Sequence, residues 1–148
     1  MPQSLSNILV HVVFSTKNRL ALIEPNAEDP LWRYLAATCT ANGCSAHKVG
    51  GTADHVHAVG SLARTVAAAD PIEEIKKSSS KWMKTKGVPA FAWQNGYGAF
   101  TIGQSQLDAV VAYVAGQKEH HRRWTSQEEF REFLANYPVP HDERYVWD

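Results

Sequence analysis

Two histidines separated by one residue are the most specific candidates for chemistry in this sequence. They stand in the run Asp54-His55-Val56-His57, at the start of a segment whose composition favours a β-strand. Side chains two positions apart in a strand point to the same face, so both imidazoles would lie side by side while Val56 points away. Two such imidazoles suit a pair of ligands for one divalent ion. The alternative is two satisfied polar side chains on an exposed sheet face.

A tyrosine and a glutamine one helical turn apart are the second candidate. Ser105 is a typical helix N-cap residue. Apolar residues follow it at helical spacing: Leu107, Val110, Val111 and Val114. Tyr113 and Gln117 then project from the flank of this apolar face, about 40° apart around the helix axis. By spacing alone, Tyr113 also fits a boundary position with its ring in the core, and Gln117 a solvated position.

These two candidates together permit phosphodiester transfer if the helix lies beside the histidine strand. The Gln117 carbonyl oxygen would then be the third ligand, and the Tyr113 hydroxyl would lie near a phosphate bound to the metal. The metal would act as a Lewis acid on the scissile phosphate, while the phenolate attacks it, forms a phosphotyrosine and releases a 3′ hydroxyl. An unperturbed tyrosine has a pKa of about 10, so it needs the metal field or a nearby base.

The predicted elements that must position these groups form an α+β fold. The patterns favour a strand at 8–15, a helix at 28–41, strands at 45–49 and 55–62, and a helix from Pro71 to about Gly87. A strand or irregular hairpin follows at 91–102, then the helix from Ser105, a helix at 126–136 with Ser126 and Glu129 as a capping box, and an extended tail after Pro138. This order predicts a ferredoxin-like antiparallel sheet with helices on one face and a C-terminal helix, in a single domain spanning 1–148.

The composition is that of a globular protein and excludes several classes. Hydrophobic residues make up 44% of the chain and charged residues 20%, far from a disordered or collagen-like profile. There is no apolar run of about 18 residues and no signal-peptide pattern at the start, so we expect no membrane association and a cytoplasmic location. Cys39 and Cys44 lack the spacing of a zinc site and are expected to be free thiols.

Several motifs, taken in order along the chain, resemble one known family. They are FSTKNR at 14–19, DHVH at 54–57, SSKW at 79–82, WQNGYGAF at 93–100, YVAGQ at 113–117 and HH at 120–121. Together they resemble the small single-tyrosine transposases of bacterial and archaeal insertion sequences. These are the IS200-like members of the HUH endonucleases, a group named for a histidine, a hydrophobic residue and a histidine. The resemblance runs from about residue 8 to residue 123.

The resemblance implies a function and a set of site residues. His55, His57 and Gln117 would bind Mg²⁺ or Mn²⁺, and Tyr113 would be the nucleophile. The substrate would be single-stranded DNA with a hairpin near the transposon end, nicked and rejoined through a 5′-phosphotyrosine. The family also implies a homodimer in which the tyrosine helix of one subunit can serve the histidine pair of the other, so placement in cis or in trans stays open.

Departures from the family pattern are mild. Ala58 and Gly60 stand where larger apolar residues are common, and Gly116 replaces the commoner asparagine. Gly116 lowers the local helix propensity and is expected to loosen the tyrosine segment. Downstream, His120 and His121 are auxiliary candidates that could orient a phosphate, assist proton transfer or interact with the helix dipole.

Any DNA-binding surface must come from local clustering, because 15 basic and 15 acidic residues give no net charge. The candidates for backbone contacts are Lys17 and Arg19 after the first strand and Lys77, Lys81 and Lys84 on the second helix. A merely solvated helix face is the alternative.

Two further functions remain open at the level of sequence. A domesticated DNA-hairpin-binding protein without transposition activity would keep the fold and would shift hairpin DNA without cleaving it. A metal hydrolase with water as its nucleophile would cleave DNA without leaving a protein-bound product.

Overall fold

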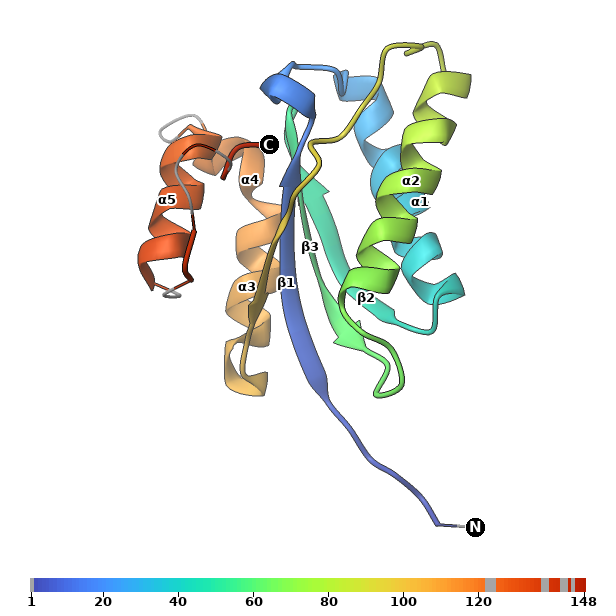
Figure 1. Ribbon diagram of the computed structural model, residues 1–148, viewed down its shortest axis with the longest axis vertical. Helices are drawn as coiled ribbons and strands as arrows, with labels where there is room; N and C mark the ends of the chain where they lie inside the picture. The colour runs from blue at the N-terminus through green and yellow to red at the C-terminus, as the bar shows by residue number, and fades with distance from the viewer. Residues whose placement is uncertain (1, 122–124, 137–138, 142–143, 145) are drawn as a thin grey trace.

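A four-stranded antiparallel sheet lies at the centre of the computed structural model, which describes residues 2–121, 125–136, 139–141, 144 and 146–148 (Figure 1). The strands are β1 (Ile8–Ser15), β2 (Ser45–Gly51), β3 (His55–Leu62) and β4 (Gly98–Thr101), in the order β2-β3-β1-β4. All neighbouring strands are antiparallel, and a helix follows β1 and another follows β3. The predicted ferredoxin-like arrangement is therefore confirmed.

Two long helices, α1 (Pro25–Ala41) and α2 (Ala69–Thr85), cover one face of the sheet (Figure 1). Alternation along the strands turns Val12 and Phe14 of β1 and Val56 of β3 toward these helices. Leu31 and Leu35 of α1 are fully buried against them. Each such side chain contributes roughly 1.5–3 kcal/mol by leaving water, so this layer is the main source of stability.

The C-terminal helices lie on the opposite side of the sheet (Figure 1). They are the short 3₁₀ turn η2 (Gln104–Gln106), α3 (Leu107–Ala115), α4 (Gln117–His120) and α5 (Ser126–Asn136). A small core of Leu9, Val59, Ile102 and Val114 holds α3 to this face. Since His55 and His57 alternate with the inward-facing Val56, they point to this second face.

The predicted continuous helix from Ser105 is wrong in two respects. Ser105 lies inside η2, and the N-cap of α3 is Gln106, whose side chain accepts a hydrogen bond from the Gly103 N–H at 2.8 Å. The helix then ends at Ala115, because Gly116 leaves the helical conformation while its N–H donates to the carbonyls of the preceding turn. Gln117 therefore begins a separate helix, α4.

The predicted capping box of α5 is also wrong by one residue. The Thr125 hydroxyl accepts a hydrogen bond from the Glu128 N–H at 3.1 Å, and the Glu128 carboxylate accepts one from the Thr125 N–H. Glu129, expected to be the capping glutamate, is instead only 3% exposed and points into the protein.

The segment between α2 and α3 is mostly irregular, since only 98–101 of the predicted 91–102 forms a strand. Trp93 makes an isolated bridge with Thr16, and its indole N–H donates to the Ser79 hydroxyl at 2.9 Å. Both Trp93 and Phe100 are buried, at 7% and 5% exposure. Among the described residues, no helix has the length and apolar content needed to cross a membrane.

Candidate active site

The two histidines of β3 and the glutamine of α4 meet on the second face of the sheet. His55 and His57 are 2% and 0% exposed, with ring centroids 5.2 Å apart. Gln117 is 1% exposed, and its Oε1 lies 3.0 Å from His55 Nε2. The structure thus brings together, within one chain, all three residues that the sequence nominates as metal ligands.

A close approach of α3 to β2 places the tyrosine beside this group. Gly50 of β2 has no side chain, and a Cβ there would lie 2.6 Å from the Val114 carbonyl oxygen. Any larger residue would push α3 away from the sheet. With glycine present, the Tyr113 ring centroid lies 5.6 Å from that of His57, with the two rings nearly perpendicular.

The orientation of His55 makes its Nε2 available to a cation. Its Nδ1 lies 2.8 Å from Asp54 Oδ1, and a carboxylate there fixes the ring proton on Nδ1. Burial alone would raise the pKa of Asp54, but its hydrogen bonds with His55 and Thr52 hold it below its usual range. With the proton on Nδ1, the Nε2 lone pair faces the Gln117 carbonyl oxygen at 3.0 Å, an arrangement in which both atoms could bind one cation.

His57 is held by a second histidine that the sequence did not nominate for the site. His11 Nε2 and His57 Nδ1 are 2.8 Å apart in the buried layer beneath the site. Burial lowers the pKa of His57 to about 4, and burial together with the charge of His57 lowers that of His11 to about 3. Both rings are therefore neutral near pH 7, the form in which imidazole binds metals.

Glu129 of α5 is the residue on which the site converges. Its carboxylate lies 2.7 Å from His57 Nε2, 3.0 Å from His120 Nε2 and 3.3 Å from His121 Nε2, and it accepts a hydrogen bond from the Tyr113 hydroxyl. Burial opposes its ionisation, yet the contacts with His121 and His57 lower the pKa of Glu129 below its ordinary value. A carboxylate is thus buried among three imidazoles and a phenol.

The tyrosine is protonated in this arrangement. Burial and the adjacent Glu129 carboxylate both raise the pKa of the Tyr113 phenol above its ordinary value. Its hydroxyl lies 3.5 Å from His120 Nε2, so His120 lies beside the candidate nucleophile, while His121 faces His55, with ring centroids 4.3 Å apart. The two auxiliary candidates therefore occupy different sides of the same cluster.

The donor set fits a divalent cation. One nitrogen or oxygen from each of His55, His57, His121 and Glu129 lies within 4.8 Å of all the others, and Gln117 Oε1 is adjacent. In the part of the chain that the structure describes, the buried Nε2 atoms of His57 and His121 have no partner with hydrogen-bond geometry. Both nitrogens face the Glu129 carboxylate, at 2.7 and 3.3 Å, so this donor set is compatible with a divalent cation.

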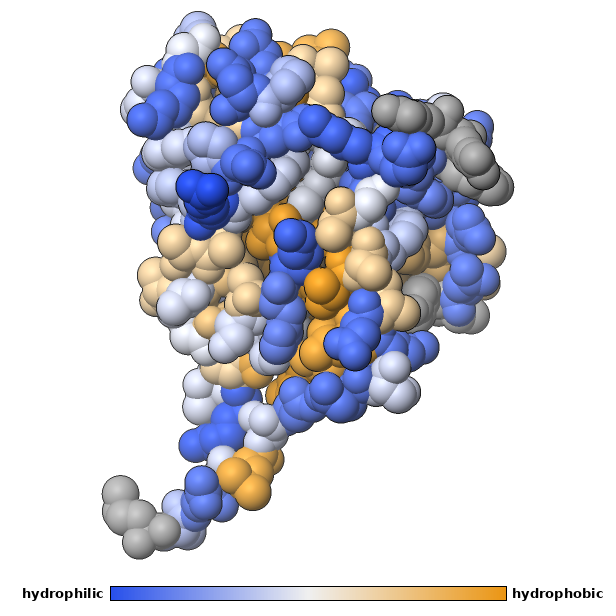
Figure 2. Space-filling view, turned by 180° about the vertical axis from the view of Figure 1, so that it is seen from behind, coloured by the Kyte–Doolittle hydropathy of each residue, from blue (hydrophilic) through white to orange (hydrophobic). Residues whose placement is uncertain are grey.

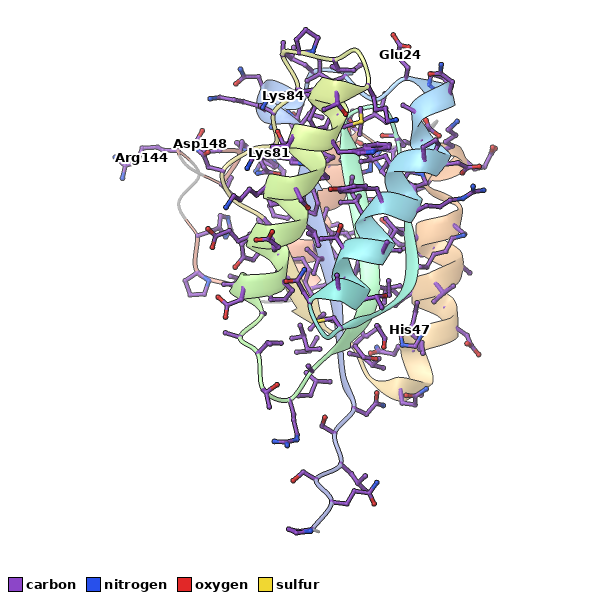
Figure 3. The ribbon with its side chains drawn as sticks, turned by 90° about the vertical axis from the view of Figure 1, so that its right-hand side faces the viewer. Glu24, His47, Lys81, Lys84, Arg144 and Asp148 are labelled. Carbon is purple, nitrogen blue, oxygen red and sulfur yellow. The ribbon has the colours of Figure 1, made fainter. Side chains whose placement is uncertain are left out.

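The basic residues nominated for DNA contacts lie outside this cluster. Lys77, Lys81 and Lys84 are exposed on α2, on the other face of the sheet, where Figure 3 shows Lys81 and Lys84 on the outer side of that helix. Lys17 is exposed after β1, and the Arg19 guanidinium lies 5.3 Å from the centre of the Trp147 ring. Arg19 lines a small pocket together with His55 and Glu129, so it is the basic candidate nearest to the site.

Sequence reasoning missed three residues of the site. Asp54 precedes a candidate ligand directly, so its proximity could have been a signal. His11 alternates onto the same face as His57 in the neighbouring strand, a weaker signal. No signal in the sequence pointed to Glu129. Its spacing from Ser126 matched a capping box, and nothing local distinguishes a capping glutamate from a buried one.

Comparison with known protein families now identifies the class. The sequence profile described as "Transposase IS200 like" matches residues 4–117. The chain therefore belongs to the IS200-like transposase family. A comparison with curated protein sequences finds no match.

Two solved structures share the fold. One is a crystal structure of a proposed transposase from Deinococcus radiodurans R1, with 18% identity and a TM-score of 0.63, covering 79% of this chain and 95% of that one. The other is a REP-associated tyrosine transposase bound to a REP hairpin, with 15% identity and a TM-score of 0.62, covering 95% of this chain and 87% of that one. At these identities the comparison establishes the architecture.

Proposed function

We propose that this transposase nicks and rejoins single-stranded DNA at hairpin-marked ends through a 5′-phosphotyrosine on Tyr113. The observation that carries the proposal is the convergence of His55, His57 and Gln117 with Tyr113 in one buried cluster. These residues come from β3, α3 and α4, and the three nominated ligands would hold Mg²⁺ or Mn²⁺. When bound, the ion would supply Lewis-acid stabilisation of the phosphate.

The side chains account for the transfer step. The Tyr113 oxygen attacks the phosphorus, forming one phosphorus–oxygen bond while the bond to the 3′ oxygen breaks. Glu129 accepts the hydrogen bond of the hydroxyl and is placed to take its proton, and the leaving 3′ oxygen gains one proton. In the rejoining step a 3′ hydroxyl attacks the phosphotyrosine, and the phenol regains its proton. His120 lies close enough to the phenol to assist either transfer.

The test is a covalent adduct on denaturing gels with labelled single-stranded hairpin DNA and Mn²⁺. Tyr113→Phe should abolish the adduct while the protein remains folded and still shifts the DNA. Tyr97→Phe is the matched control, since Tyr97 is 41% exposed and makes no contact with the cluster in the described structure, and it should form the adduct normally. An adduct that persists in Tyr113→Phe would reject the nucleophile.

The same experiment separates the alternative functions. A hairpin-binding protein without transposition activity would shift the DNA without cutting it. This alternative is favoured by the resting state of Tyr113, whose hydroxyl is bound to Glu129 and whose pKa is raised. A water-using hydrolase would cut the DNA and leave no adduct. The adduct in the unaltered protein distinguishes the transposase from both.

The proposed partners are hairpin DNA and a second copy of the chain. The related structure that carries a REP hairpin supports the first. For the second, residues 2–7 extend away from the sheet, and Leu5 in this segment is 82% exposed (Figures 1 and 2).

The proximity of Tyr113 to His57 supports catalysis in cis. Mixing Tyr113→Phe with His57→Gln subunits tests this arrangement. Sites assembled in trans would recover DNA cleavage in the mixture, whereas sites assembled in cis would leave it inactive.

A further inference from the structure

Glu129 is buried beside the histidines of β3, unlike a glutamate that caps a helix or lies on the surface. It comes from α5, beyond the part of the chain matched by the family profile, yet its side chain reaches the β3 histidines. One carboxylate oxygen, Oε1, lies 2.7 Å from His57 Nε2. The other, Oε2, lies 3.3 Å from His121 Nε2 and accepts the Tyr113 hydroxyl.

The distances between these donors are compatible with a single shared ion. Ligands placed about 2.0–2.2 Å from one metal are separated from each other by roughly 3 Å. The separations from Glu129 to the two imidazoles, and from His55 to Gln117, are 2.7, 3.3 and 3.0 Å. At 2.7 Å, the contact between Glu129 and His57 still lacks hydrogen-bond geometry at the His57 nitrogen.

The charge of the cluster leads to the same conclusion. A carboxylate buried to 3% exposure is stable when it is paired with a cation or binds a metal. Its nearest described neighbours are imidazoles and a phenol, and the nearest Lys or Arg of the cluster's pocket, Arg19, is engaged with the Trp147 ring. A divalent ion would supply the missing charge and would satisfy the two imidazole nitrogens at once.

We propose that Glu129 is itself a ligand of the ion bound by His55 and His57, with His121 as a further ligand. This inference rests on the metal site of the proposed function and extends it to α5. Glu129 would then serve two groups, because Oε1 faces the metal position while Oε2 holds the Tyr113 hydroxyl. α5 therefore completes the metal site and fixes the nucleophile beside it.

The test measures binding of Mn²⁺ alone, without DNA, to the full chain by electron paramagnetic resonance titration of the free ion. Glu129→Gln keeps the size of the side chain and removes its charge, and it should weaken Mn²⁺ binding about 10–100-fold or more. Glu132→Gln is the matched control: it makes the same change on the same helix at an exposed position outside the ligand group, and it should bind Mn²⁺ as the unaltered protein does.

A purely structural role for Glu129 predicts a different result. It would lower the melting temperature of Glu129→Gln without metal but leave the rise in melting temperature caused by Mn²⁺ unchanged. A ligand predicts that this rise shrinks. Mn²⁺ affinity of Glu129→Gln within twofold of the unaltered protein would overturn the inference while leaving the proposed function intact. Failure of the unaltered protein to bind Mn²⁺ would instead reject the metal site itself.

A second measurement uses only the unaltered protein, so it does not require the Glu129→Gln variant to fold. In the unaltered protein labelled with ¹³C at glutamate carboxyl groups, bound Mn²⁺ should show a carboxylate carbon coupling by electron–nuclear double resonance. Glu129 is the one glutamate of the ligand group among the described residues, so absence of the coupling would also overturn the inference.

Discussion

The two faces of the sheet differ in what they bury, although the same strands build both. Toward α1 and α2, the described residues form a core of 13 buried apolar side chains, whereas the core under α3 has 4. The second face instead buries polar groups, each at 3% exposure or less: His11, His55, His57, Gln117 and Glu129. Burying polar groups costs free energy unless they find partners. The first face therefore supplies most of the stability, whereas the second holds a buried polar cluster, the candidate active site, at a cost in free energy.

The largest expected effect falls on the stabilising face. Phe14→Ala should lower the free energy of unfolding by about 3–5 kcal/mol, because it leaves a cavity among fully buried neighbours. Chemical denaturation monitored by circular dichroism measures the change. Leu20→Ala, at a residue 54% exposed, should stay within about 0.5 kcal/mol. A comparable loss in both variants would remove the distinction between core and surface.

On the second face, we expect a substitution to reduce activity more than stability. His57→Gln should reduce DNA cleavage at least about 100-fold, or roughly 2.7 kcal/mol, through loss of one ligand. Its neighbour Val56 points to the other face, so Val56→Ala should lower stability and leave the activity of the folded protein unchanged. Cleavage rates at a temperature where both variants are folded check the pair. Equal activity losses in both would contradict the division between the faces.

Acidification should destabilise the buried histidines of the second face. The pKa of His11 is lowered from the ordinary 6.5 to about 3, so between these values the unfolded chain is protonated and the folded one is not. Stability from this group is therefore present above pH 6.5 and lost as the pH falls toward 3. His11→Leu should reduce the pH slope of the unfolding free energy by up to about 1.4 kcal/mol per pH unit between pH 6 and pH 4. Identical slopes in the variant and the unaltered protein would argue against a buried neutral His11.

The smallest expected effect is a change in stability at the N-terminus of α5, the helix that carries Glu129. Thr125→Ala should lower stability by about 1 kcal/mol, because it removes the hydroxyl that caps α5. Thr125→Ser keeps the hydroxyl and should change stability by less than about 0.5 kcal/mol. Thermal denaturation of both variants measures the difference. Equal losses in the two variants would show that the Thr125 hydroxyl does not cap α5.

The strands and the long helices could be predicted from the sequence because they depend on local periodicity. β1 and β3 have the predicted bounds, and the strand order follows from antiparallel neighbours joined by short connections and helices. The errors fall in the segment 91–102, of which only 98–101 forms a strand, and at helix ends, at Ser105, at Gly116 and at the start of α5. There, adjacent residues compete for the same capping role with similar energies, and the tertiary contacts choose between them.

The sequence by itself determined that His55 and His57 share a face, since strand geometry sets side-chain direction. Only the tertiary structure decided how Tyr113 and Gln117 reach that face, because Gly116 divides them between α3 and α4 and the approach of α3 depends on the missing side chain of Gly50. It alone placed Glu129 and His11 in the cluster. Residues far apart in the chain carry no local signal of their contact, which arises from packing helices against a sheet.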